Sequence, residues 1–118
     1  MVSHDARPPL LIACLCAQWC GTCKDYERTF RQIEAQFPGA RFVWVDIEDE
    51  SDLVDPVEVE NFPTLLIADG PEPRFIGPLT PQPETLSRLV RAELERSGPG
   101  LAQPEVRDLV ARLQAQVA

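Results

Sequence analysis

The chain has 118 residues, of which 44% are hydrophobic and 25% charged, and these proportions are typical of one small globular domain. Its formal net charge is −8, which argues against a nucleic-acid partner, because binding to phosphates requires clustered lysine and arginine. No run of the sequence approaches the roughly 18 apolar residues of a membrane-spanning helix, so we expect no membrane partner.

The N-terminal part of the chain predicts a short arm followed by a strand. Residues 1–9 form the arm, and the apolar run from Leu10 to Ala17 predicts the strand. The run does not have the form of a secretory signal, because two prolines precede it and no cationic start is present. We therefore expect a cytoplasmic protein, whose cysteines normally rest as thiols.

Two cysteines, Cys20 and Cys23, lie between this strand and a predicted helix. Cys20 falls at the helix N-terminus, where unpaired backbone N–H groups and the macrodipole stabilise the attacking thiolate. Cys23 lies one turn inside the helix, so we expect it to be more buried and to react second. The helix is predicted from apolar residues at spacings of four, three and four, namely Tyr26, Phe30, Ile33 and Phe37.

The middle of the chain predicts further strands and helices. The run from Arg41 to Ile47 is almost continuously apolar, which predicts a central strand covered on both faces. Residues 46–60 include eight acidic residues and no basic one. We interpret this segment as a solvated loop with a short helix; the alternative is a surface that steers a basic partner. Thr64 to Ala68 and Arg74 to Ile76 predict an antiparallel hairpin. A helix is then expected from about Glu84 to Arg96.

Residues 97–118 predict a linker and a last amphipathic helix. We expect this helix to cover an apolar surface of its own domain. The alternative is a contact with a second copy or a partner, and the oligomeric state stays open. Its apolar stripe consists of Val106, Leu109, Val110, Leu113 and Val117.

Two segments resemble the thioredoxin family. Residues 19–23, Trp-Cys-Gly-Thr-Cys, resemble the family's active-site turn, and residues 62–64, Phe-Pro-Thr, resemble its cis-proline turn. The resemblance covers residues 10–96 and implies an α/β, thioredoxin-like domain with a central mixed sheet of about four strands flanked by helices. Only the arm precedes residue 10, so we expect the usual N-terminal strand-helix unit to be missing and the C-terminal helix to be an addition.

The resemblance implies a thiol–disulfide oxidoreductase that acts on disulfide-containing proteins and is restored by a separate thiol reductant. Cys20 would attack the substrate and Cys23 would resolve the mixed disulfide, with no bound cofactor and no metal. Thr22 carries no charge, which favours a reductase over an oxidase or isomerase. The residues implied to form the substrate-binding surface are Trp19, Gly21, Thr22, Phe62, Pro63 and Thr64.

The sequence departs from the family near the dithiol. Thioredoxins usually carry a buried Asp six residues before the first active cysteine and a Lys on the neighbouring strand, whereas this chain has Cys14 and Trp44 there. We expect Cys14 and Cys16 to be small hydrophobic residues of the core, the alternative being a redox role, since both lie within a few residues of the dithiol. Without the acid, no local carboxylate is evidently placed to take the proton from Cys23, so we expect slow resolution near neutral pH.

The four cysteines and the thioredoxin-like scaffold allow two other functions. Four thiolates suit zinc or an iron–sulfur cluster, so Cys14, Cys16, Cys20 and Cys23 define a metal-binding hypothesis. Against it, the first two cysteines alternate along a strand and the other two begin a helix. The second hypothesis is a redox-silent docking domain on a thioredoxin scaffold, which is disfavoured because both active cysteines are present.

Overall fold

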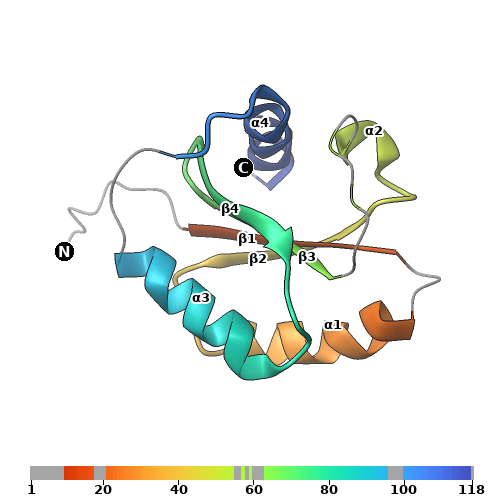
Figure 1. Ribbon diagram of the computed structural model, residues 1–118, viewed down its shortest axis with the longest axis vertical. Helices are drawn as coiled ribbons and strands as arrows, with labels where there is room; N and C mark the ends of the chain where they lie inside the picture. The colour runs from red at the N-terminus through yellow and green to blue at the C-terminus, as the bar shows by residue number, and fades with distance from the viewer. Residues whose placement is uncertain are drawn as a thin grey trace.

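The computed structural model describes residues 10–17, 21–54, 57, 59, 63–95 and 100–117. One mixed sheet lies between two layers of helices (Figure 1), which confirms the expected α/β class. The strands are β1 (Leu10–Cys16), β2 (Arg41–Asp46), β3 (Thr64–Asp69) and β4 (Glu72–Pro78). The helices are α1 (Gly21–Glu34), α2 (Ser51–Val54), α3 (Pro83–Glu95) and α4 (Pro104–Val117). None of the helices in these ranges is long and apolar enough to cross a membrane.

Strand β1 lies inside the sheet, and all seven of its residues are buried. The strand order is β2-β1-β3-β4, with β1 parallel to β2 and antiparallel to β3. Because side chains of a strand alternate between faces, β1 serves two separate clusters. Ile12, Cys14 and Cys16 pack in one of them, and Leu11, Ala13 and Leu15 pack in the other.

Strand β2 lies at an edge of the sheet formed by the described residues, so the predicted central position is wrong. Helices nevertheless cover both of its faces. Phe42 packs in the cluster that includes residues of α1 and α3, and Val45 packs in the cluster that includes residues of α2 and α4. An apolar run indicates that both faces of a strand are covered. It does not indicate whether one or two other strands pair with its edges.

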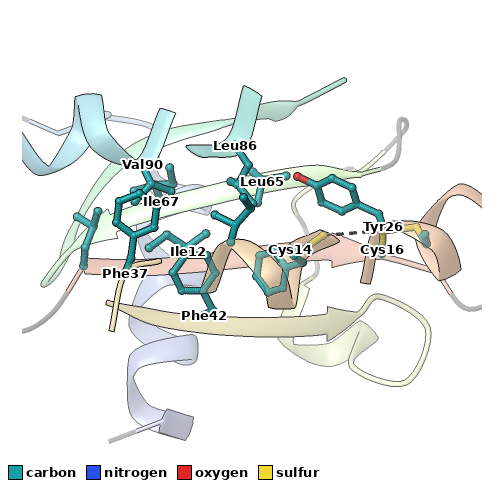
Figure 2. Close-up of a cluster of buried hydrophobic side chains, with 14 residues drawn as sticks. Ile12, Cys14, Cys16, Tyr26, Phe37, Phe42, Leu65, Ile67, Leu86 and Val90 are labelled. Atoms are coloured by element: carbon teal, nitrogen blue, oxygen red, sulfur yellow. Dashed lines mark hydrogen bonds between the residues drawn. A yellow bond between two sulfur atoms is a disulfide. The ribbon is translucent and has the colours of Figure 1, made fainter. Parts of the chain in front are cut away.

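Helices α1 and α3 cover one face of the sheet (Figure 1). Helix α3 begins at Pro83, whose fixed φ and missing N–H suit the first helical position. From α3, Leu86 and Val90 point into the same aromatic-rich cluster as Phe42 (Figure 2). The face of α1 that packs there has spacings of three, four and three and consists of Cys23, Tyr26, Phe30 and Ile33.

Helix α4 and the short helix α2 cover the opposite face (Figure 1). Four residues of the predicted apolar stripe are buried against the sheet, so α4 packs on its own domain. The side chain of Val117 lies outside the described residues. The four residues are Val106, Leu109, Val110 and Leu113.

Two glycines allow the tight chain path around the β3–β4 hairpin. Gly70 occupies the turn with a φ of 60°, a left-handed conformation that side chains disfavour. Gly100 lies so close to the hairpin that a Cβ atom there would be 2.6 Å from the Pro73 carbonyl oxygen. A larger residue at position 70 would strain the turn, and one at position 100 would push the chain away from the hairpin.

Polar contacts hold the entry and the side of α4 to this hairpin. The Leu101 N–H donates to the Pro73 carbonyl at 2.7 Å. The Arg107 guanidinium lies 2.9 Å from a Glu72 carboxylate oxygen, and that pair is exposed. The Gln114 amide donates to the Gly70 carbonyl at 2.9 Å. Contacts at three positions between residues 101 and 114 therefore hold α4 and the chain before it to the hairpin.

Candidate active site

The end of β1 and the start of α1 meet at a disulfide between Cys16 and Cys23. Cys16 is the last residue of β1, and Cys23 is the third residue of α1. Their Cα atoms are 5.8 Å apart, within the usual range for disulfides. Each side chain is 1% exposed, so the bond lies beneath the surface at the N-terminus of α1.

A third sulfur lies beside this bond. The Cys14 thiol donates to Cys16 Sγ at 3.9 Å, and both point to the same face of β1 (Figure 2). Burial raises the pKa of Cys14 well above its ordinary value; the Glu27 charge raises it further, and the Arg31 charge opposes the shift. Cys14 therefore stays a neutral thiol near neutral pH and is not a base.

A backbone donor faces the sulfur of Cys23. The N–H of Ala17, the residue that follows β1, lies 3.4 Å from Cys23 Sγ and donates to it. When the disulfide is reduced, a hydrogen bond to the sulfur favours its thiolate over its neutral thiol. The main chain thus supplies some of the stabilisation that a buried Cys23 thiolate needs.

Tyr26 closes the site from the side of α1. It is 1% exposed, and burial together with neighbouring Cys14 raises the pKa of its hydroxyl. Within the described ranges, its hydroxyl oxygen has no hydrogen-bond partner. The ring packs in the sulfur-containing cluster (Figure 2), so the surroundings of the three cysteines are apolar.

Pro63 lies at the same end of the sheet. Thr64 begins β3 and pairs with Leu15, so the next antiparallel position sets Pro63 opposite Cys16. Pro63 is buried, and its carbonyl accepts the Leu79 N–H at 3.1 Å. The bond between residues 62 and 63 lies outside the described residues, so a cis peptide stays a prediction.

Comparison with known sequences decides the family. The sequence model described as Thioredoxin matches residues 2–86. The chain belongs to the thioredoxin family. It is 30% identical to Thioredoxin H2-1 of Oryza sativa subsp. japonica over 77 residues, which are 64% of this chain and 56% of that protein. It is 32% identical to Thioredoxin-1 of Saccharomyces cerevisiae over 65 residues, which are 55% of this chain and 63% of that protein.

The chain spans about half the length of the curated relatives it matches. Among solved structures, it is similar to thioredoxin from Trypanosoma brucei brucei, with 28% identity, a TM-score of 0.67, and coverage of 77% of this chain and 80% of that one. It also resembles oxidised thioredoxin from Plasmodium falciparum, with 20% identity, a TM-score of 0.62, and coverage of 71% and 80%. The second likeness concerns the thioredoxin fold alone.

The structure brings together some of the site residues predicted from the thioredoxin resemblance. Gly21 and Thr22 are exposed at the start of α1. Cys23, Pro63 and Thr64 are buried at the adjoining end of the sheet. The other predicted residues, Trp19, Cys20 and Phe62, lie outside the described residues, so the pairing of Cys20 with Cys23 stays a prediction.

The bond from Cys16 to Cys23 is not among the pairings predicted from the sequence. The sequence favours a core role for Cys16 over a redox role, and the structure joins this cysteine to the predicted resolving cysteine. The missed signal is positional. Only four residues separate the end of β1 at Cys16 from the start of α1 at Gly21, and such a short separation in sequence limits how far apart Cys16 and Cys23 can be. The bond also uses two of the four sulfurs that the metal hypothesis requires.

Proposed function

We propose that this protein is a thiol–disulfide oxidoreductase that reduces disulfides of other proteins through Cys20 and Cys23. The observation that carries the proposal is the disulfide formed by Cys23 in the first turn of α1, in a chain of the thioredoxin family. Disulfides form and break by attack of a thiolate on a bonded sulfur. A sulfur held in this position suits such exchange.

The reaction has two steps. The Cys20 thiolate attacks a substrate sulfur and forms a mixed disulfide, and the other substrate sulfur leaves as a thiolate. Cys23 then attacks Cys20 Sγ, which releases the second substrate thiol and forms the Cys20–Cys23 disulfide. The substrate gains the two electrons and two protons that the cysteines lose. Exchange requires no bound cofactor, and a separate thiol reductant restores the pair.

The two roles are supported by position and burial. Cys20 directly precedes Gly21, the first residue of α1, and the N-terminal end of a helix stabilises a thiolate. Cys23 is 1% exposed, which suits a thiol that attacks an enzyme sulfur and not a distant substrate. The Ala17 N–H supports the Cys23 thiolate in the second step.

We infer that the substrate chain lies across the turn before α1 and the start of β3. Gly21 and Thr22 are exposed there, and Pro63 lies opposite the end of β1. A cytoplasmic location and a role in cell redox homeostasis remain predictions. The full proposed surface consists of Trp19, Gly21, Thr22, Phe62, Pro63 and Thr64.

Turnover of a disulfide-linked reporter protein, with dithiothreitol as the reductant, tests the proposal. Both Cys20→Ser and Cys23→Ser should fall to the rate of dithiothreitol alone, because each removes one step of the exchange. Cys23→Ser should also accumulate a mixed disulfide between Cys20 and the reporter. Mass spectrometry under non-reducing conditions would measure that adduct.

The matched control is Cys14→Ala, which removes a buried thiol outside the proposed pair. It should retain turnover when the rate is expressed per folded molecule. A folded Cys20→Ser protein that still turned over would rule out Cys20 as the attacking thiol.

A further inference from the structure

Cys23 has two candidate disulfide partners in this chain. The spacing of the active-site turn pairs it with Cys20, and the structure pairs it with Cys16. One sulfur forms only one disulfide at a time, so the two bonds are alternative oxidised forms. Each form leaves a different cysteine as a free thiol.

We propose that Cys16 is a third redox-active cysteine, which exchanges with Cys20 for the sulfur of Cys23. The inference rests on the proposed reduction of substrates by Cys20 and Cys23. In the form shown by the structure, Cys23 is bound to Cys16. Cys20 is then a thiol without its resolving partner.

The exchange is balanced without another reagent. The Cys16 thiolate attacks Cys23 Sγ, the Cys16–Cys23 bond forms, and the Cys20–Cys23 bond breaks. Cys20 leaves as a thiolate and takes up the proton that Cys16 lost. The exchange involves no net oxidation, because one disulfide bond replaces another; the two electrons lost by the protein went to the substrate disulfide in the earlier step.

The positions of the two sulfurs support a bond that forms within the folded protein. Both residues belong to regular elements, and the Cys16 carbonyl accepts the Ile47 N–H at 2.9 Å, which fixes the end of β1. Both side chains are 1% exposed, so an oxidant in solution has little access. Transfer of the bond from Cys20 avoids this obstacle, because the exchange takes place between sulfurs of the same chain and needs no oxidant from solution.

Cys14 shows that Cys16 does not bond to every nearby cysteine. Its sulfur lies 3.9 Å from that of Cys16, yet it remains a free thiol. Proximity to Cys16 is therefore insufficient, and the bond forms with the cysteine that approaches from α1. The same comparison makes Cys14→Ala the natural control for any effect of removing a buried sulfur.

The exchange changes how the protein handles a substrate. With Cys23 bound to Cys16, Cys20 is able to form a mixed disulfide, but Cys23 is unable to resolve it. The adduct then persists until an external thiol attacks it or until the Cys16–Cys23 bond is reduced. Cys16 thus converts a dithiol enzyme into one with a single reactive thiol.

Peptide mapping of the wild-type protein tests the exchange. The reduced protein is oxidised with one equivalent of a disulfide-linked reporter, quenched with acid, alkylated and digested with chymotrypsin. Cleavage after Leu15 and Trp19 places Cys16 on one peptide and Cys20 with Cys23 on another. We expect a cross-linked pair of these peptides in which Cys20 carries the alkyl group.

Two variants sharpen the result. Cys14→Ala should keep the cross-linked peptides, and Cys16→Ala should lose them and show only the Cys20–Cys23 loop. Circular dichroism checks folding, and the wild-type measurement stands even if Cys16→Ala does not fold. Alkylated Cys16 in every oxidised wild-type molecule, with Cys20 bound to Cys23, would overturn the inference and leave the proposed reductase intact. Oxidation of neither Cys20 nor Cys23 by the reporter would instead defeat the proposed function.

Discussion

The two faces of the central sheet have different compositions. The face under α1 and α3 holds the described cysteines and a group of aromatic rings, including Tyr26 and Phe30. In the described part of the chain, the face under α4 and α2 is built from aliphatic residues alone, such as Leu15 and Leu109. Strand β1 supplies both faces from alternate positions. Neighbouring residues of one strand thus contribute to different surroundings, with the cysteine sulfurs on one side and purely aliphatic contacts on the other.

This separation means that changes on the aliphatic face should alter stability and leave the sulfur chemistry intact. Changes to the buried Cys14 thiol or the buried Tyr26 hydroxyl on the sulfur face should act through ionisation and alter how stability depends on pH. Aromatic contacts hold the sulfur face in place, with the rings of Phe30 and Phe42 5.2 Å apart and those of Phe30 and Trp44 5.7 Å apart.

The largest expected effect is that of Leu109→Ala on the aliphatic face. Leu109 is fully buried between α4 and the sheet, so truncation leaves a cavity. The free energy of unfolding should fall by about 2–5 kcal/mol, as for other buried leucines. Urea denaturation measures the change, and reporter turnover per folded molecule should match that of the wild type.

Leu94→Ala is the control for this prediction, because it makes the same chemical change at a side chain that is 46% exposed. Its effect should stay within about 0.5 kcal/mol. Equal losses of stability in the two variants would show that α4 does not depend on burial of Leu109. A lower turnover per folded molecule in Leu109→Ala would break the separation between the two faces.

A smaller effect is expected from Cys14→Ala in alkaline solution. Burial raises the pKa of Cys14 above its ordinary value of 9.0, so the folded protein keeps a proton that the unfolded chain loses. The free energy of unfolding is therefore unaffected by Cys14 ionisation below about pH 9. Above that pH it falls, by up to about 1.4 kcal/mol per pH unit, because only the unfolded chain loses the proton. Urea denaturation of the oxidised protein between about pH 8 and about pH 10 should show a shallower decline for Cys14→Ala.

The Tyr26→Phe variant distinguishes the effect of Cys14 ionisation from that of Tyr26 ionisation. The pKa of Tyr26 is also raised, from an ordinary value of 10.0, so its removal should flatten the stability curve only at a higher pH than Cys14→Ala does. Identical pH profiles for wild type and Cys14→Ala would mean that the buried thiol is ionised equally in the folded and unfolded states.

The smallest effect concerns the exposed pair between Glu72 and Arg107. The hydrogen bond from Arg107 holds the pKa of Glu72 below its usual value. Arg107→Gln should move that pKa back towards the usual value, which an NMR titration of the Glu72 carboxyl would detect. Added salt should produce part of the same shift in the wild type, because an exposed pair is screened. A titration curve unaffected by the variant would mean that the pair does not form in solution.

The fold was predictable because its signals are local. Alternation and apolar runs indicated the strands, and three-to-four spacing indicated α1 and α4. The edge position of β2 was not predictable, because it depends on which strands pair and not on how the strand is covered. The place of α4 was one of two options that an apolar stripe allows, and only packing distinguishes them.

The prediction of the candidate site rests on its two motifs. The resemblance indicated residues 19–23 and 62–64 as the active site. The bond from Cys16 to Cys23 was not predicted, because a cysteine in an apolar strand looks the same in sequence whether it packs as a hydrophobic residue or bonds to a partner. The distinction lies in the distance between the end of β1 and the first turn of α1, which residue type alone does not specify.

The position of α4 has a consequence for synthesis. Leu11 lies near the start of the chain, and Leu113 of α4 packs in the same cluster. The aliphatic face of the sheet therefore remains uncovered until the chain has emerged from the ribosome beyond residue 113. Contacts between such distant segments form slowly, and exposed apolar surface invites aggregation while they are absent. Until α4 is available to pack, chaperones that bind aliphatic surfaces have an opportunity to engage the nascent chain.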